Sequence, residues 1–162
     1  MGLREEFIKN VSEEVEHNSI YVWGGQGELL TQCTLSKIES MEGGNKTNVN
    51  RILKHISDIY LKGISRARLF DCSGLLTFHL IKLGLLYYDT TANGLFKKCV
   101  PISKKELIPG DFVFKVNEGK AVHVALFVGD NRLVECVGRD EGVQFTTLST
   151  KFNKYGRFPK FA

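Results

Sequence analysis

Long apolar runs are missing from this sequence. No segment approaches the roughly 18 consecutive apolar residues that a membrane-spanning helix needs, so we expect no membrane span. The first residues, MGLREEFIKNVSEE, mix charged with apolar side chains and lack the continuous apolar core of a secretory signal. We therefore expect no signal peptide, and the sequence leaves the compartment unknown.

Cysteine is scarce and widely spaced. Cys33, Cys72, Cys99 and Cys136 include no CxxC pair, so the spacing predicts neither a zinc site nor a disulfide framework, and free thiols are expected. Proline is limited to 3 residues, and with 16 glycines in 162 residues the composition excludes a collagen-like repeat and gives no sign of disorder.

A strong charge of either sign is also lacking. The formal net charge is +4, and the basic residues are scattered, with no basic stripe interleaved with aromatic side chains. Such a mild excess suits an anionic polymer, a cell wall or a nucleic acid, without deciding between them. The absence of a stripe argues against a nucleic-acid partner.

What the sequence does contain is enough apolar material for one core. Of its residues, 43% are hydrophobic, which fits a single domain over residues 1–162. Apolar spacing predicts a helix over 3–16, and residues 20–25 form a short β-prone run that ends in two glycines. Residues 26–68 are the least regular part. With short helices expected near 36–40 and 49–61, we interpret them as a helical insertion.

The second half of the chain reads as strands separated by turns. Strands are predicted over 112–116, 123–128, 132–137 and 143–148, with 155–158 as a further edge strand. Helices followed by an antiparallel meander are typical of an α+β fold.

The segment from Phe70 to Gly74, FDCSG, is the strongest candidate for a reactive site. It leads into the apolar stripe of a helix that is expected to end near Gly84. Cys72 would lie at the N-terminus of this helix, where free N–H groups and the helix dipole favour a thiolate. Because the thiolate is the reactive form of cysteine, Cys72 is the expected nucleophile.

A cysteine nucleophile needs a base and a group that orients the base. His123, inside an apolar strand, is the candidate base; the alternative is an ordinary core histidine. Glu135, on the next predicted strand, is the candidate orienting group, since a carboxylate in an apolar strand is costly unless it is paired. With a two-residue turn at 130–131 the two side chains would face opposite sides of the sheet. Their contact therefore requires a three-residue turn at 129–131 or a bulge.

Four motifs then occur in order: YVWGG at 21–25, FDCSGL at 70–75, LIPGD at 107–111 and HVALFVG at 123–129. Together, over most of the chain from residue 20 to about 143, they resemble the NlpC/P60 cell-wall cysteine peptidases. The resemblance implies a reduced papain-like α+β fold, in which the helix of the catalytic cysteine packs on an antiparallel sheet. It also implies hydrolysis of peptidoglycan stem peptides, commonly between D-γ-glutamate and a diamino acid.

Carried over residue by residue, the resemblance makes Cys72 the nucleophile and His123 the general base. Glu135 falls where the family has its third polar residue, most often a histidine, so glutamate is a departure. Tyr21 matches a tyrosine that helps to bind the oxyanion or the substrate; the alternative is a core aromatic residue. Asp71 and Ser73 match positions that hold the amino end of the stem in some members, although both types also cap helices.

We therefore expect a cysteine endopeptidase with a peptidoglycan stem peptide as partner and with no metal or organic cofactor. The long stretch between the first two motifs is expected to line or narrow the groove. A phage or mobile-element setting is favoured, and the oligomeric state is not predicted. The alternatives are an amidase or acyltransferase on the same scaffold and a phage tail structural protein with a vestigial site.

Overall fold

The computed structural model describes residues 1–161. The first half of the chain contains α1 (Leu3–Glu16), β1 (Ile20–Tyr21), β2 (Gln26–Leu29), α2 (Leu35–Met41), α3 (Lys46–Ile59) and β3 (Arg68–Phe70). The second half contains α4 (Cys72–Lys82), α5 (Ala92–Lys98), β4 (Val100–Ile102), β5 (Phe112–Asn117), β6 (Lys120–Gly129), β7 (Arg132–Cys136), β8 (Val143–Thr147) and β9 (Lys154–Arg157). None of the helices described is both long enough and apolar enough to cross a membrane.

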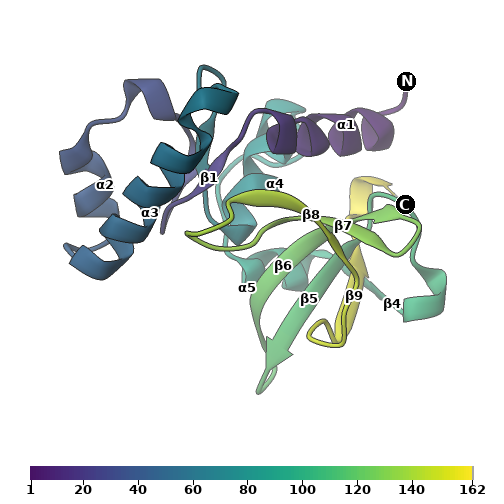
Figure 1. Cartoon of the computed structure of the whole chain (residues 1–162). Coiled ribbons are helices and arrows are strands. Elements are labelled where there is room, and N and C mark those ends of the chain that lie inside the picture. The colour runs from purple at the N-terminus through teal and green to yellow at the C-terminus, as the bar shows by residue number, and fades with distance from the viewer. Residues whose placement is uncertain (162) are drawn as a thin grey trace.

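A six-stranded antiparallel sheet forms one layer of the molecule, in the order β4-β9-β5-β6-β7-β8 (Figure 1). α1 and α4 pack on one face of it through a continuous apolar core. Phe7 of α1, Leu76 and Leu80 of α4, and Phe112 and Leu126 of the sheet are fully buried there. The expected α+β fold, with the Cys72 helix packed on an antiparallel sheet, is confirmed.

A second, three-stranded sheet in the order β1-β3-β2 connects this layer to the rest of the chain. Because side chains alternate along a strand, β3 faces two cores at once. Leu69 packs among the apolar residues of the first half of the chain, whereas Phe70 packs in the main core. This short strand leads directly into Asp71 and Cys72.

Residues 30–67, which we call the arm, contain α2 and α3 and extend to one side of the sheet (Figure 1). Their apolar residues pack with β1 and β3: Ile38, Ile52 and Ile59 are buried in the same cluster as Ile20 and Leu69. The two ends of the arm meet, since Leu29 and Arg68 are paired in the β2–β3 ladder. The helices expected near 36–40 and 49–61 are therefore present.

Three features differ from the sequence-based expectations. The segment 26–68, interpreted as a helical insertion, begins and ends in strands, β2 and β3. These strands are too short to show a recognisable alternation of apolar and polar residues. Residues 92–98 form α5, capped by Thr91, a helix that was not predicted. The strand expected at the edge over 155–158, β9, lies between β4 and β5, so β4 is the edge. β4 was not predicted.

The glycine pair at 24–25 fixes the segment after β1 against the start of α4. Gly24 has φ +74°, a conformation that favours glycine, and the Gly25 carbonyl accepts a hydrogen bond from the Asp71 N–H at 3.1 Å. A Cβ on Gly25 would collide with the backbone of Leu69 and Phe70. The close approach that the glycines suggested is therefore present, and it brings Tyr21 beside Cys72.

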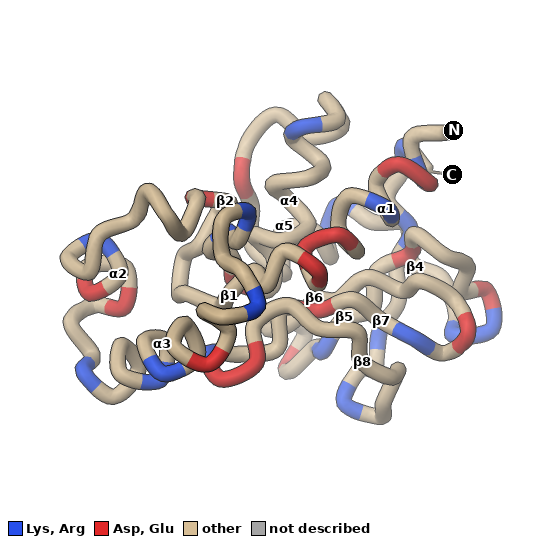
Figure 2. The backbone as a smooth tube through the Cα atoms, turned by 45° about the horizontal axis from the view of Figure 1, so that its top comes forward, with Lys and Arg blue, Asp and Glu red and all other residues tan. Residues whose placement is uncertain are grey.

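Charged residues are distributed over the whole molecule. Figure 2 shows Lys and Arg segments interspersed with Asp and Glu segments along both the arm and the main sheet. Several of these opposite charges pair across elements, and two such pairs adjoin the site described next.

Candidate active site

A pocket of about 500 Å³ opens at the N-terminus of α4. Five of the residues predicted from the sequence line it: Tyr21, Asp71, Cys72, Ser73 and His123. The sixth, Glu135, is bonded to His123 on the neighbouring strand. The fold thus brings together side chains from four separate segments of the chain, and we call this cavity the Cys72 pocket.

Cys72 is the first residue of α4, and Asp71 caps that helix. The Asp71 Oδ1 accepts hydrogen bonds from the Gly74 N–H at 2.7 Å and from the Ser73 hydroxyl at 3.3 Å. This capping satisfies N–H groups that would otherwise lack a partner and fixes the direction in which the helix begins. Asp71 therefore does have the helix-capping role that was the alternative to substrate binding, whereas Ser73 supports it by donating to the capping carboxylate.

The Cys72 thiol is not activated by its position alone. Burial, followed by the charge of Asp71, raises the pKa of Cys72 to about 11, although backbone N–H groups of Val124, Ser73 and Cys72 itself act in the opposite direction. The expectation that the helix N-terminus favours a thiolate is wrong for the free protein, because desolvation outweighs the dipole. Cys72 is a thiol at neutral pH and needs a base.

The pH dependence of alkylation tests this conclusion. With a pKa near 11, the thiolate fraction of Cys72 rises about tenfold per pH unit below that value. We expect its rate of reaction with iodoacetamide to rise about tenfold per pH unit, or about 100-fold between pH 7 and 9, as measured by peptide mass spectrometry. A rate that is already constant across this range would instead indicate a preformed thiolate–imidazolium pair.

His123 and Glu135 are in hydrogen-bond contact at the wall of the pocket. The His123 Nε2 lies 2.7 Å from the Glu135 Oε2, and the Glu135 side chain is only 2% exposed. Burial raises the pKa of Glu135, but hydrogen bonds from His123 and Thr146 and the charge of Lys151 outweigh burial and lower it to about 2. Glu135 is therefore ionised at neutral pH.

The ionised carboxylate decides the tautomer of His123. A carboxylate can only accept hydrogen bonds, so the neutral imidazole carries its hydrogen on Nε2 and its lone pair on Nδ1. The ring stacks on Phe152, with centroids 5.8 Å apart, which limits its rotation. Nδ1 is thus the basic nitrogen available to a group in the pocket.

A β-bulge provides the register that the sequence analysis required. The turn is the two-residue one, Asp130–Asn131, with Gly129 opposite Arg132, but the ladder shifts by one residue between Phe127 and Gly129. Leu126 is then opposite Val134, and the same register continues to place Glu135 next to the His123 end of β6. Without the bulge the two side chains would face opposite sides of the sheet.

Tyr21 lines the pocket on the side of the arm. Burial, and then the charges of Cys72 and Asp71, raise the pKa of Tyr21, so its phenol stays protonated. The Arg139 guanidinium carbon lies 5.1 Å from the centre of the Tyr21 ring. Tyr21 is partly buried and packs against the main core, so its side chain contacts the core and also lines the pocket.

The sequence analysis missed several residues of the site. Thr146 and Lys151 hold Glu135, at 2.6 Å and 3.2 Å. Trp23, Arg51 and Arg139 line the pocket. Trp23 lies inside the YVWGG motif, which was a usable signal. The two arginines belong to no motif, and their only signal is that Arg139 follows the strand of Glu135 closely.

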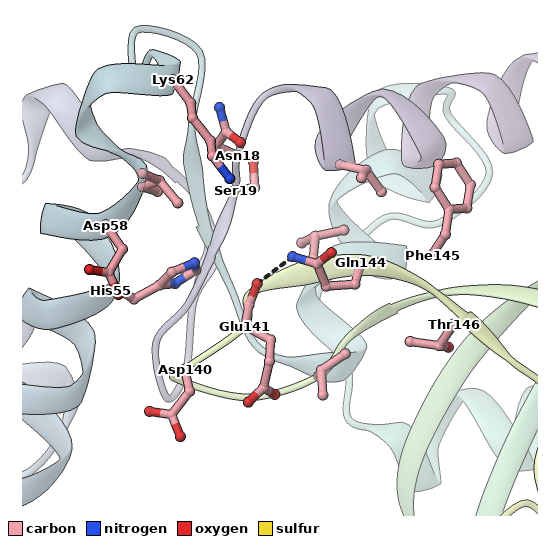
Figure 3. A pocket seen from close by; sticks show the side chains of 14 residues that line it. Asn18, Ser19, His55, Asp58, Lys62, Asp140, Glu141, Gln144, Phe145 and Thr146 are labelled. Carbon is pink, nitrogen blue, oxygen red and sulfur yellow. Dashed lines mark hydrogen bonds between the residues drawn. The ribbon is translucent and has the colours of Figure 1, made fainter.

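A larger cavity, of about 560 Å³, lies between α3 and β8 (Figure 3). Figure 3 shows His55 and Asp58 of α3 facing Glu141 and Gln144 across it. His55 is buried, and burial lowers its pKa. No cysteine lines this cavity within the part of the chain that the structure describes, so the Cys72 pocket is the candidate active site.

The other cysteines and His79 lie outside the Cys72 pocket. All four cysteines fall within the described residues and are free thiols. His79 is buried, and its Nε2 lies 2.7 Å from the Glu14 Oε2, so its surroundings give it a structural role. Over residues 1–161, no cluster of three or more His, Cys, Asp or Glu side chains is arranged to hold a metal ion.

Comparisons with known proteins match this region. The model of the NlpC/P60 family matches residues 57–158, a range that includes Cys72, His123 and Glu135. The murein DD-endopeptidase MepH of Escherichia coli K12 is 30% identical over 117 residues, or 69% of this chain and 43% of MepH. The bifunctional muramidase/DL-endopeptidase CwlT of Bacillus subtilis is 34% identical over 113 residues, or 66% and 33%. The chain thus spans less than half of the length of either relative.

Solved structures have the same fold at low identity. The P60 domain of antigen MAP1204 from Mycobacterium avium subspecies paratuberculosis superposes with a TM-score of 0.61 at 18% identity, covering 96% of both chains. RipD of Mycobacterium tuberculosis, described as a non-catalytic NlpC/p60 domain protein adapted to peptidoglycan binding, also gives 0.61, at 19% identity, covering 97% and 98%. With the family match extending over most of the sequence, the chain belongs to the NlpC/P60 family.

Proposed function

We propose that this chain is a cysteine peptidase that hydrolyses peptidoglycan stem peptides at the bond between D-γ-glutamate and the diamino acid. One observation carries the proposal: Cys72 and His123 line one pocket, and His123 is bonded to an ionised Glu135. The names of MepH and CwlT, a murein DD-endopeptidase and a DL-endopeptidase, support a substrate in the cell wall.

The first chemical step is the formation of a thioester. The Nδ1 of His123 takes the proton of the Cys72 thiol, and the sulfur attacks the scissile carbonyl carbon. The Cys72 N–H and the Tyr21 hydroxyl are the donors for the oxyanion that forms. A protonated Tyr21 suits this role, since its raised pKa keeps the hydroxyl as a donor.

The second step releases both products. His123, now an imidazolium, gives its proton to the amine of the leaving diamino acid. A water molecule then attacks the thioester carbonyl while His123 accepts its proton, and the Cys72 thiol is restored. Glu135 stabilises the imidazolium and keeps the ring in its tautomer throughout. Besides the substrate peptide, these steps use Cys72, His123, Glu135, the oxyanion donors and water.

Asp71 and Ser73 complete the proposed site. Capping engages the Asp71 Oδ1, and both residues also line the pocket. We propose that the carboxylate of Asp71 additionally receives the amino end of the stem peptide, as the family pattern implies. Because this end carries a positive charge, an ionised Asp71 beside it is electrostatically favourable.

Digestion of purified peptidoglycan tests the function. Soluble fragments of walls with lysine and with diaminopimelate stems would be identified by mass spectrometry. The expected products have a diamino acid at a new N-terminus. Fragments freed only at the cross-link would identify a DD-endopeptidase, and glycan strands separated from intact stems would identify an amidase. If no wall type is cut, the proposed activity is wrong.

A further inference from the structure

Two ion pairs join the arm to the loop that follows β7; the arm supplies the acidic residue of one pair and the basic residue of the other. Glu42 of the arm pairs with Arg139, and Arg51 of the arm pairs with Asp140. The first pair is buried, with side-chain exposures of 1% for Glu42 and 18% for Arg139, whereas the second is exposed at 44% and 53%. The buried pair is therefore the one that fixes geometry, because exposed pairs contribute little.

Glu42 is held from several directions. Its oxygens accept hydrogen bonds from the Arg139 Nη2 at 2.7 Å and the Arg139 Nε at 3.1 Å, and its Oε2 accepts one from the Trp23 N–H at 2.8 Å. A buried carboxylate is stable only with such partners. The result is a guanidinium in a single orientation, anchored by a residue of the arm.

Part of Arg139 remains available to a ligand. Its Nε and Nη2 face Glu42, while its Nη1 has no hydrogen-bond partner among residues 1–161. The guanidinium stacks over Tyr21 and lines the Cys72 pocket. Because a guanidinium has five N–H donors in a planar fork, it can bind a second carboxylate while Glu42 holds the first edge.

The proposed substrate carries a carboxylate in a suitable place. A glutamate linked through its γ-carbonyl leaves its α-carboxylate free, separated from the scissile carbonyl only by the glutamate's own carbons. Cys72, Tyr21 and Arg139 line the same pocket, and Arg139 stacks on the Tyr21 ring. A carbonyl at Cys72 thus leaves the α-carboxylate in the pocket that Arg139 lines.

We infer that Arg139 is a specificity-determining residue that binds the free α-carboxylate of the D-glutamyl residue, and that Glu42 of the arm is the positioning residue that holds it. This inference rests on the proposed function. It gives the arm a role in the choice between stems with a free carboxylate and stems in which that carboxylate is amidated.

A matched pair of substrates tests it. L-alanyl-γ-D-glutamyl-L-lysine and its α-amide, the D-isoglutaminyl peptide, differ only in the carboxylate; the diaminopimelate analogues replace them if digestion favours that stem. The wild type should cleave the acid with a kcat/KM about tenfold or more above that of the amide, since a charge-assisted hydrogen bond is lost in the amide. Arg139→Gln should bring the ratio near one, because it lowers the value for the acid far more than the value for the amide.

The variant Glu42→Gln distinguishes a role of Glu42 in positioning Arg139 from a role in the folding of the chain. It keeps an acceptor for the Trp23 N–H but weakens the hold on Arg139, so the KM for the acid should rise several-fold while kcat for the amide stays unchanged. Because Arg139→Gln leaves Glu42 buried and unpaired, the double variant Glu42→Gln/Arg139→Gln, which is neutral, should also show a ratio near one. Arg132→Gln, on the exposed end of β7, is the control that should leave the ratio intact.

Other outcomes would overturn the inference without touching the function. These are equal cleavage of the two peptides by the wild type, a ratio unchanged in Arg139→Gln, and a ratio lost in Arg51→Gln alone. Cleavage only at the cross-link would overturn both the inference and the bond named in the proposed function. If the wild type cuts neither peptide nor any wall, the proposed function itself fails.

Discussion

Replacing Cys72 with alanine is expected to abolish wall hydrolysis, with a loss of at least about 10⁴-fold in kcat. In the proposed mechanism the Cys72 sulfur is the atom that bonds to the substrate, and no thioester can form without it. Cys72→Ser should be almost as inactive, since a hydroxyl is much harder to deprotonate than a thiol. Release of soluble fragments from labelled peptidoglycan measures the loss.

The control for this variant is Cys33→Ala, which removes a partly exposed thiol of the arm away from the pocket. It should retain full activity and the same melting temperature. Substantial hydrolysis by Cys72→Ala would mean that another group is the nucleophile, and the roles assigned to His123 and Glu135 would then be wrong.

Glu135→Gln is expected to reduce kcat by about 10²–10⁴-fold with a small change in KM. The neutral amide cannot stabilise the imidazolium that forms when His123 takes the Cys72 proton. It can also turn its NH₂ group toward Nε2, which would favour the tautomer with the hydrogen on Nδ1. Steady-state kinetics on a stem tripeptide give the two parameters, and an unchanged kcat would contradict the orienting role.

The same substitution has a predicted effect on stability that depends on pH. A pKa lowered from 4.5 to about 2 means that the ionised Glu135 stabilises the folded state by on the order of 3 kcal/mol above pH 4.5, and this is lost as pH falls through 2. The free energy of unfolding of the wild type should therefore decrease more steeply from pH 5 to 2 than that of Glu135→Gln. Glu118→Gln, in an exposed turn, should follow the wild type.

Most of the framework could be predicted from local patterns. The helix over 3–16 and the strands of the meander depend on apolar spacing, which is visible within a few residues. The strands missed, β2, β3 and β4, have three or four residues each, and they exist because neighbouring chain segments pair with them. The edge position was misassigned to β9 because strand order is a property of the whole sheet.

The features of the site also fall into two groups: those with a signal in the local sequence and those that depend on the whole fold. Cys72, His123 and Glu135 could be selected because each is unusual in its own segment. The Cys72 pKa was predicted in the wrong direction, since burial comes from the surrounding fold and the helix N-terminus is only one contribution. The pairing of Glu42 with Arg139 spans 97 positions in the sequence, and nothing near either residue indicates it.

The pairing of Leu29 with Arg68 has a consequence for divergence within the family. Because the arm leaves and rejoins the domain at adjacent positions, its length can change with little effect on the spacing of Tyr21 and Cys72, and longer loops cost only slightly more entropy. Natural selection can therefore exchange one arm for another while the reaction is retained. Substrate preference is then free to change between lineages faster than catalysis does.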